Sequence, residues 1–364
     1  MGNTVSFWRG AKADRIDKAS SRFLELDALR GIAALVVVLY HYSTQYDKVF
    51  GHIKTDYVTM FSLGHYGVQL FFIISGFVIY MSIMKVSSVK DFIIKRSFRL
   101  YPAYIFAVII TFIVVSLSTM DYLKVSLSDA MINFTMFQGF IPGVDNVDGV
   151  YWTLRVEMTF YILMGILLFM KLEKKLMFIA ITWLILSSVI QTLHFFLDTN
   201  ITFLLETVSI SDYSQLFIIG MILFSIWKYG NNFKYFFVLF ITITYDFVYQ
   251  GIESGFFTLF FVIVFFLVIN QKLTLLKSRI FVFLGTISYP LYLLHQFIGY
   301  VLINYMESIG LIHEFYIVIP IIISIIGAYL LYKYIEVPLQ NVLYKKYNNI
   351  KNRHKVTSST LTKV

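Results

Sequence analysis

The chain has 364 residues, of which 58% are hydrophobic and only 14% are charged, and its mean hydropathy is +0.75. A soluble globular domain carries roughly 25% charged residues, so this composition excludes a soluble protein and predicts an all-α, polytopic helical membrane protein. The absence of cysteine excludes a disulfide framework, a thiolate nucleophile and a cysteine-ligated metal, and we predict no metal site. We assign the net charge of +9 to cytoplasmic segments and predict no nucleic-acid partner.

Ten apolar stretches of the chain have the character of transmembrane helices. The first and the seventh are short and need help from flanking aromatic residues. The predicted spans are 28–43, 65–84, 100–118, 151–170, 176–194, 212–228, 234–250, 253–269, 281–304 and 314–334.

The basic residues gather on one side of these spans. If the N-terminus is cytoplasmic, the inside segments hold 25 of the 30 Lys and Arg residues and the outside loops hold 3. This distribution follows the positive-inside rule and predicts that both termini are cytoplasmic. We divide the chain into a cytoplasmic tail (1–22) with no cleavable signal peptide, a membrane domain (23–340) and a basic cytoplasmic tail (341–364), which we expect to be disordered or bound to the membrane surface.

Arg30 and His41 lie eleven residues apart in the first apolar stretch. Eleven steps of about 100° make three turns plus roughly 20°, so both side chains lie on one helix face, about 16 Å apart along the axis. Arg30 could snorkel to the inner headgroups, and His41 could be an interfacial histidine bonded to a carbonyl. A charged and a titratable group on one intramembrane face favour a functional site.

Arg96 and Arg99 stand at positions i and i+3 at the cytoplasmic start of the third span. They could be ordinary positive-inside charges. Together with Arg30 they would instead form a basic inner mouth that binds a phosphate-rich ligand, because guanidinium pairs with phosphate in a bidentate way. Pro102 is predicted in the first turn of this span, where its missing N–H costs little.

Glu157 lies about two turns inside the fourth span, at a depth similar to that of His41. It could be a buried partner of Arg155 or of another cation. A carboxylate beside His41 would instead fix the tautomer of the ring and raise its basicity. Tyr161 follows one turn further along the same span.

Two further segments combine polar residues with helix-packing signals. Ser75 and Gly76 in the second span are more typical of close helix packing than of a site. His295 lies near mid-membrane in a segment bent by Pro290, where a histidine is costly unless it faces the bundle interior or a wet cavity. A structural and a functional role are equally compatible with His295.

These segments together resemble the acyltransferase-3 family of integral membrane acyltransferases. The matching pieces, in order, are LDALRGIAALVVVLYH, GVQLFFIISGFVI, RSFRLYPAY, YWTLRVEMTFYI and ISYPLYLLH. The resemblance implies that Arg30 and His41 form the arginine-x10-histidine motif of the family, and that Arg96 and Arg99 form its arginine-x-x-arginine motif. It also implies that Ser75 opens the serine-glycine-phenylalanine signature. Members O-acylate bacterial surface polysaccharides, lipopolysaccharide, nodulation factors and peptidoglycan, which implies a place in the bacterial inner membrane.

We hypothesise an acyl-CoA-dependent membrane O-acyltransferase, with acetyl-CoA as the first choice of donor. Arg30, Arg96 and Arg99 would hold the donor phosphates on the cytoplasmic side. His41 would act as general base on a hydroxyl of an extracytoplasmic glycan or lipid-linked sugar, and Glu157 would orient His41 or the acceptor. His41, Glu157 and Arg30 form the predicted catalytic group. Four further residues are assigned to the substrate or the oxyanion, namely Arg155, Tyr161, Ser75 and His295.

Several alternatives stay open at this point. The acyl group could be succinyl or longer, and His41 could carry it in a two-step route. A transporter or exporter of a glycan or anionic substrate would also use intramembrane Arg, His and Glu, and a structural subunit of a polysaccharide machine is a further class. Membrane lipids are expected partners, and the oligomeric state is open.

Overall fold

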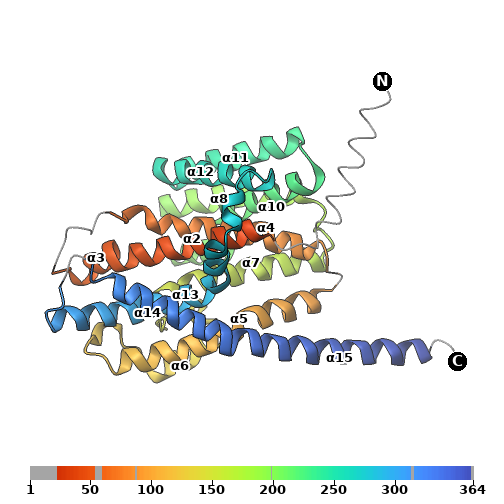
Figure 1. Ribbon diagram of the computed structural model, residues 1–364. Coiled ribbons are helices and arrows are strands. Elements are labelled where there is room, and N and C mark those ends of the chain that lie inside the picture. Colours follow the sequence, from red (N-terminus) through yellow and green to blue (C-terminus); the bar gives the residue numbers. More distant parts are fainter. Residues whose placement is uncertain (1–22, 54–59, 87, 198, 313–314, 362–364) are drawn as a thin grey trace. The chain divides into compact units, whose positions relative to one another are not determined.

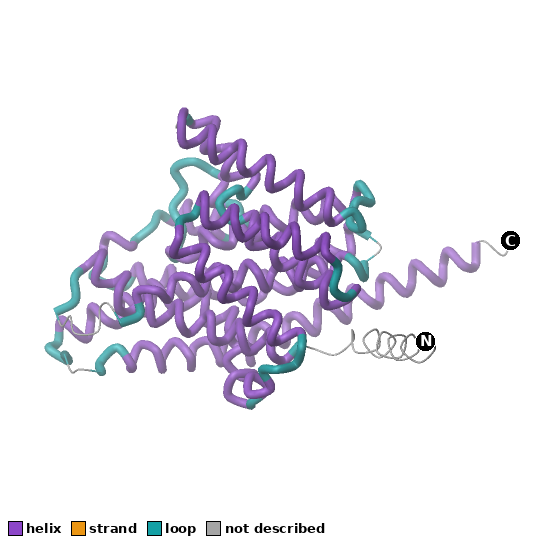
Figure 2. Tube along the Cα trace, turned by 90° about the horizontal axis from the view of Figure 1, so that it is seen from above, coloured by secondary structure: helices purple, strands orange, loops and turns teal. Residues whose placement is uncertain are grey.

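The computed structural model describes residues 23–53, 60–86, 88–197, 199–312 and 315–361, with side chains through Asn352. Within these ranges every regular element is a helix, and there is no strand (Figure 1). Figure 2 shows the same helices joined by loops and turns. The all-α class predicted from the sequence is confirmed.

The helices follow the apolar stretches of the sequence. In chain order they are α2 (Leu24–Tyr40), the π-helix η2 (His41–Gln45), α3 (Tyr46–Phe50), α4 (Gly67–Ile83), α5 (Val89–Ser116), α6 (Leu127–Asn133), α7 (Trp152–Phe169), α8 (Leu176–Leu197), α9 (Asn200–Ser209), α10 (Ser214–Tyr229), α11 (Phe233–Tyr249), α12 (Ile252–Ile269), α13 (Arg279–Ser308), α14 (Val318–Leu331), the π-helix η8 (Tyr332–Glu336) and α15 (Val337–Leu361).

Eight helices among the described residues are long and apolar enough to cross a membrane. The prediction of about ten spans also included α2 and α11, which are α-helices of only 17 residues, or about 26 Å. That length falls short of a hydrocarbon core of about 30 Å, although α2 continues directly into η2. The polytopic helical class is confirmed, while the count of ten and the side on which the termini lie stay predictions.

Two helices extend beyond the apolar stretches that predicted them. α5 begins at Val89, about eleven residues earlier than expected, so Pro102 lies in its interior and not in its first turn. α15 continues through the segment 341–361, which is helical, whereas we expected a tail that is disordered or bound to the membrane surface. The first part of α15 packs along α5 (Figure 1). Lys351 forms an ion pair with Asp91. The predicted boundary at residue 340 therefore falls inside a helix.

The contacts divide the chain into two compact units, each assembled from three stretches. The first unit comprises Met1–Ala33, His65–Lys85 and Ile166–Thr286, and the second comprises Ala34–Gly64, Val86–Gly165 and Ile287–Val364. This division differs from the predicted boundaries at residues 22 and 340, which stay a prediction.

Two glycines bring α4 and α10 into backbone contact in the first unit. A Cβ on Gly76 would lie 2.2 Å from the carbonyl oxygen of Phe217, and a Cβ on Gly220 would lie 2.1 Å from that of Ile73. Real side-chain atoms cannot approach so closely, so only glycine permits this crossing. The packing role that the sequence suggested for the segment around Gly76 agrees with this contact.

Candidate active site

The imidazole of His41 lies against the imidazole of His295 in the second unit. His41 opens the π-helix η2 and is half-buried, and His295 lies on α13 with no exposed surface. The Nε2 atom of His295 is 3.1 Å from Nδ1 of His41, and the ring centroids are 4.9 Å apart. His295 is therefore the direct partner of His41, although the sequence left its role open.

The hydrogen bonds assign the proton on each ring. Nδ1 of His41 is 2.9 Å from the carbonyl oxygen of Val37, and Nδ1 of His295 is 2.9 Å from that of Tyr292. A carbonyl oxygen only accepts, so both Nδ1 atoms carry hydrogen and each neutral ring keeps its lone pair on Nε2. His295 directs this lone pair at the Nδ1 hydrogen of His41. The Nε2 lone pair of His41, to which no group in the described part of the chain bonds, is left as the base.

Tyr42, the second residue of the π-helix, fixes the histidine pair in place. Its hydroxyl donates to the carbonyl oxygen of His295 at 2.7 Å, and the hydroxyl of Ser324 on α14 donates to it at 2.7 Å. Gly299 leaves room for the ring, because a Cβ there would lie 2.1 Å from Cε1 of Tyr42. A π-helix is a rare geometry that recurs at functional sites, and here it brings His41 and Tyr42 to the same turn of α13.

Asp148 and Tyr151 hold this turn of α13 from the segment that leads into α7. Oδ2 of Asp148 accepts from the N–H of Phe297 at 3.0 Å, and the Tyr151 hydroxyl donates to the carbonyl oxygen of Leu293 at 3.3 Å. Asp148 has no exposed surface, and burial raises its pKa to about 7. These bonds anchor the backbone on both sides of His295.

A second polar cluster of the same unit contains the predicted arginine pair. Arg99 forms an ion pair with Glu336, which is almost completely buried at the end of η8. Gln340 donates to the same carboxylate at 3.1 Å, and the Arg99 guanidinium lies over the ring of Tyr289, 5.4 Å from its centroid. A phosphate that binds Arg99 would therefore share the guanidinium with Glu336 or displace that carboxylate.

Glu157 belongs to the arginine cluster. Its carboxylate accepts from the hydroxyl of Tyr161 one turn further along α7, and the guanidinium of Arg96 lies 6.0 Å from the centre of the Tyr161 ring. Glu157 also interacts electrostatically with Tyr289. From the sequence we predicted that Glu157 orients His41 or the acceptor, and in the structure the side chain bonded to His41 is the imidazole of His295. A role for Glu157 in orienting the substrate stays a proposal.

α13 connects the two clusters. Tyr289 belongs to the arginine cluster and His295 to the histidine pair, and six residues correspond to about 9 Å along a helix axis. α7 runs beside α13 over this distance, because the hydroxyls of Thr153 and Tyr292 are 2.9 Å apart and Glu157 lies one turn on, near Tyr289. The cationic and basic groups are thus about two helical turns apart within one unit.

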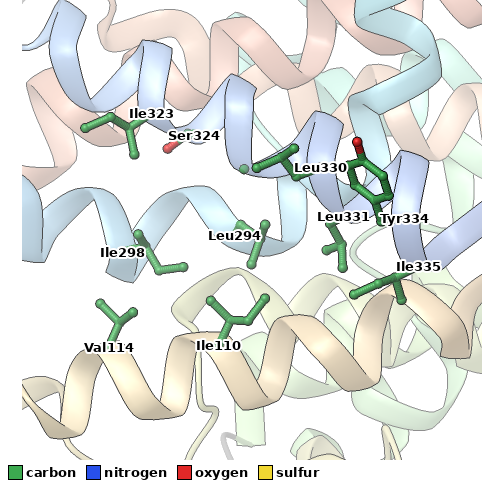
Figure 3. Close-up of a pocket in the computed structure, with 11 residues that line it drawn as sticks. Ile110, Val114, Leu294, Ile298, Ile323, Ser324, Leu330, Leu331, Tyr334 and Ile335 are labelled. Carbon is green, nitrogen blue, oxygen red and sulfur yellow. The ribbon is translucent and has the colours of Figure 1, made fainter.

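An apolar cavity of about 400 Å³ lies beside the histidine turn, between α5, α13 and α14. Figure 3 shows Leu294 and Ile298 of α13 facing Ile110 and Val114 of α5 across it. Ser324, which bonds to Tyr42, contributes its polar edge. The residues that line this cavity are mostly apolar, and none of them is a cation. The cavity therefore suits a hydrocarbon chain better than a phosphate group.

The remaining predicted residues lie elsewhere. Arg30 and Ser75 belong to the first unit, where the Arg30 guanidinium lies 3.9 Å from Asp27. In the second unit the stem of Arg155 packs on the loop at Gly139, where a Cβ would meet Cδ of Arg155 at 2.8 Å. Their roles in a site stay predictions.

Sequence reasoning missed three residues that organise the second unit. Glu336 carried a usable signal, because it is an acidic residue just after the last predicted span, in a segment whose other charges are basic. Asp148 precedes α7 and resembles any helix-capping aspartate, and Tyr42 resembles any interfacial tyrosine. Only their tertiary contacts distinguish them.

Fold and site together define a polytopic helical membrane protein with two hydrogen-bonded imidazoles and an arginine cluster in one compact unit. The family profile described as "Acyltransferase domain" matches residues 23–333, which is most of the chain. The chain therefore belongs to the acyltransferase-3 family, as its motifs suggested.

Two curated relatives match parts of the chain. "Nodulation protein 10" of Rhizobium leguminosarum bv. viciae is 33% identical over 119 residues, which cover 28% of this chain and 32% of that protein. "O-acetyl transferase" of Shigella phage Sf6 is 28% identical over 152 residues, which cover 38% of this chain and 44% of that protein. The matches thus span less than half of either relative. No solved structure matches the chain at a significant level.

Proposed function

We propose that this protein is a membrane O-acyltransferase that moves an acetyl group from acetyl-CoA to a hydroxyl of an extracytoplasmic glycan or lipid-linked sugar. Membership of the acyltransferase-3 family and the likeness to a protein named O-acetyl transferase support the reaction class. The observation that carries the proposal is the pairing of His41 with His295, which leaves the Nε2 lone pair of His41 as a base.

The base takes part in both halves of the transfer. Nε2 of His41 removes the proton of the acceptor hydroxyl as its oxygen attacks the thioester carbonyl. The tetrahedral intermediate then expels the CoA sulfur, which receives the same proton from the imidazolium, so that an ester and free CoA result. Positive charge on His41 strengthens the bond that its Nδ1–H donates to His295, which favours the transition state. Proton transfer of this kind contributes typically about 10²–10⁴ in rate.

Donor binding is assigned to the arginine cluster. Arg99 and Arg96 carry the charge that phosphates require, and their cluster lies about 9 Å along α13 from the histidine pair. An extended pantetheine arm bridges such a distance. In the free protein Glu336 compensates the Arg99 charge. A contribution of Arg30 to donor binding stays a prediction, and docking from the cytoplasm follows from the predicted topology.

The test compares surface glycans by mass spectrometry from cells that carry the wild type, His41→Ala or no copy of the gene. We expect the wild type to add one acetyl unit per modified residue and His41→Ala to add none, with membrane insertion unchanged. His65→Ala is the matched control, because this histidine is exposed and lies outside the site. Wild-type acetylation by His41→Ala would reject the proposed base. Movement of an unmodified glycan or anion with no covalent change would point to a transporter.

A further inference from the structure

A buried cluster of hydrogen bonds surrounds His52 and reaches the π-helix η2 at Tyr42. His52 follows α3, and its Nδ1 is 3.0 Å from Oε1 of Glu307 and 2.9 Å from the hydroxyl of Tyr316. Its Nε2 is 2.8 Å from the carbonyl oxygen of Tyr42. The side chain of His52 has no exposed surface and that of Glu307 is 7% exposed, so water contributes little to their stabilisation.

The contact with Tyr42 assigns one hydrogen on the His52 ring. The carbonyl oxygen of Tyr42 only accepts, so Nε2 of His52 carries hydrogen and donates to it. Nδ1 of His52 and the Glu307 carboxyl group share a second hydrogen bond at 3.0 Å, and the hydroxyls of Tyr46 and Tyr316 donate to the same carboxyl group. Asp47 accepts from the His52 backbone N–H at 3.0 Å.

The His52 ring holds the residue next to the proposed base. Tyr42 accepts from His52 through its carbonyl oxygen and donates to the His295 carbonyl through its hydroxyl. A π-helix is less favourable than an α-helix, so it persists only where outside contacts hold it. His52 supplies such a contact one residue beyond His41, at the start of the π-turn.

We propose that His52, held in place by its hydrogen bond with Glu307, is a positioning residue that locks the π-turn and so keeps Nδ1 of His41 on His295. This inference rests on the proposed function, since it names a residue that acts through the proposed base. His52 touches neither substrate. Misplacement of a catalytic group by about 1 Å can cost about 10²-fold in rate, so loss of the clamp should appear in kcat.

The experiment uses the full-length protein, purified in detergent and reconstituted into liposomes, with acetyl-CoA as donor. We expect His52→Ala to lower kcat by about 10- to 100-fold while the KM for acetyl-CoA stays within about twofold. His52→Gln should recover part of the loss, because its amide can still donate to the Tyr42 carbonyl. Glu307→Gln keeps the shape of the cluster but replaces the carboxyl group with an amide, so it should lower kcat less than His52→Ala does. The double variant His52→Ala/Glu307→Gln should have almost the same kcat as His52→Ala alone, because the pair acts as a unit.

A spectroscopic readout separates positioning from general stability. The protein contains seven histidines, so nitrogen-15 labelling of histidine allows the His41 ring to be assigned by its absence in His41→Ala. In the wild type it should show one tautomer with hydrogen on Nδ1, and in His52→Ala a mixture. His194→Gln is the matched control, because His194 also faces a glutamate, Glu206 at 3.7 Å, but belongs to the first unit.

Each outcome decides one question. A mixed His41 tautomer and a lower kcat in the His52 variants, with both unchanged in His194→Gln, support the clamp. A wild-type kcat and a single His41 tautomer in both His52→Ala and Glu307→Gln overturn it. An active His41→Ala protein overturns the proposed function itself, whatever the His52 variants show.

Discussion

Replacement of His295 tests the histidine pair most directly. His295→Phe keeps an aromatic ring of similar size in a fully buried position but removes the nitrogen that accepts from Nδ1 of His41. The carbonyl oxygen of Val37, 2.9 Å from Nδ1, stays as the second acceptor for that hydrogen, so the change removes one of two bonds. The variant therefore isolates the contribution of one hydrogen bond to the charged form of the base.

The size of the effect follows from that bond. A hydrogen bond to a charged group contributes about 1.5–3 kcal/mol, and Nδ1 of His41 carries this charge only while Nε2 holds the proton of the acceptor. At about 1.36 kcal/mol per factor of ten, kcat should fall by roughly 10- to 150-fold. His41→Ala should cost more, since it removes the proton transfer itself.

The assay is acetyl transfer by reconstituted protein at saturating acetyl-CoA. His295→Gln should retain more activity than His295→Phe, because its amide oxygen can accept from His41. His65→Phe is the control for a histidine-to-phenylalanine change at an exposed position. A kcat for His295→Phe within twofold of the wild type, in a protein that unfolds at the wild-type temperature, would refute the proposed stabilisation of the imidazolium.

Three further predictions concern the arginine cluster, the glycine contact and the buried aspartate. Arg99→Ala should raise the KM for acetyl-CoA about 10-fold or more, because a phosphate contact is lost, and an unchanged KM in a kinetic assay would place Arg99 outside the donor site. The variant should also unfold at a lower temperature, because Glu336 loses its compensating charge. Gly220→Ala should lower the free energy of unfolding by about 1–3 kcal/mol, measured by denaturation in detergent, and an unchanged value would contradict the close approach of α4 and α10. The pKa of Asp148 is raised to about 7, so the folded state binds a proton more tightly than the unfolded chain does, and stability should decline by roughly 4 kcal/mol as pH rises from about 4 to 7. Asp148→Asn should flatten this decline in thermal unfolding curves, and an unaltered pH dependence would refute the assignment.

Much of the helical architecture could be predicted because its signals are local. Apolar length sets the spans, and the alternation of basic segments sets a testable topology. The sequence did not reveal that α5 begins before its apolar stretch and that α15 continues after the last one. The apolar pattern ends where a helix leaves the membrane, although the backbone hydrogen bonds of the helix continue. The segment 89–99 and the helix after Val337 are both charged, and they support each other through contacts such as Lys351 with Asp91. Such pairing between distant stretches has no local signature.

In the candidate site, too, the features that depend on local spacing could be predicted, and those that depend on distant contacts could not. The spacing of Arg30 and His41 follows from helix geometry alone, and Arg96 and Arg99 follow from their position at a span end. The partner of His41 was not predictable, because His295 is 254 residues away along the chain. A carboxylate at a similar depth was the chemically stronger candidate. The contacts of α13 select the imidazole over Glu157.

The order of residues along α13 limits how this site can change. Tyr289 lies under the Arg99 guanidinium, and six residues later His295 meets His41. One inserted or deleted residue between them would rotate His295 by about 100° and shift it by about 1.5 Å relative to Tyr289. The hydrogen bond from the Phe297 N–H to Asp148 would be lost at the same time. A change of length in this segment therefore alters both the distance and the angle between the arginine cluster and the histidine pair, and the proposed transfer requires that both be kept.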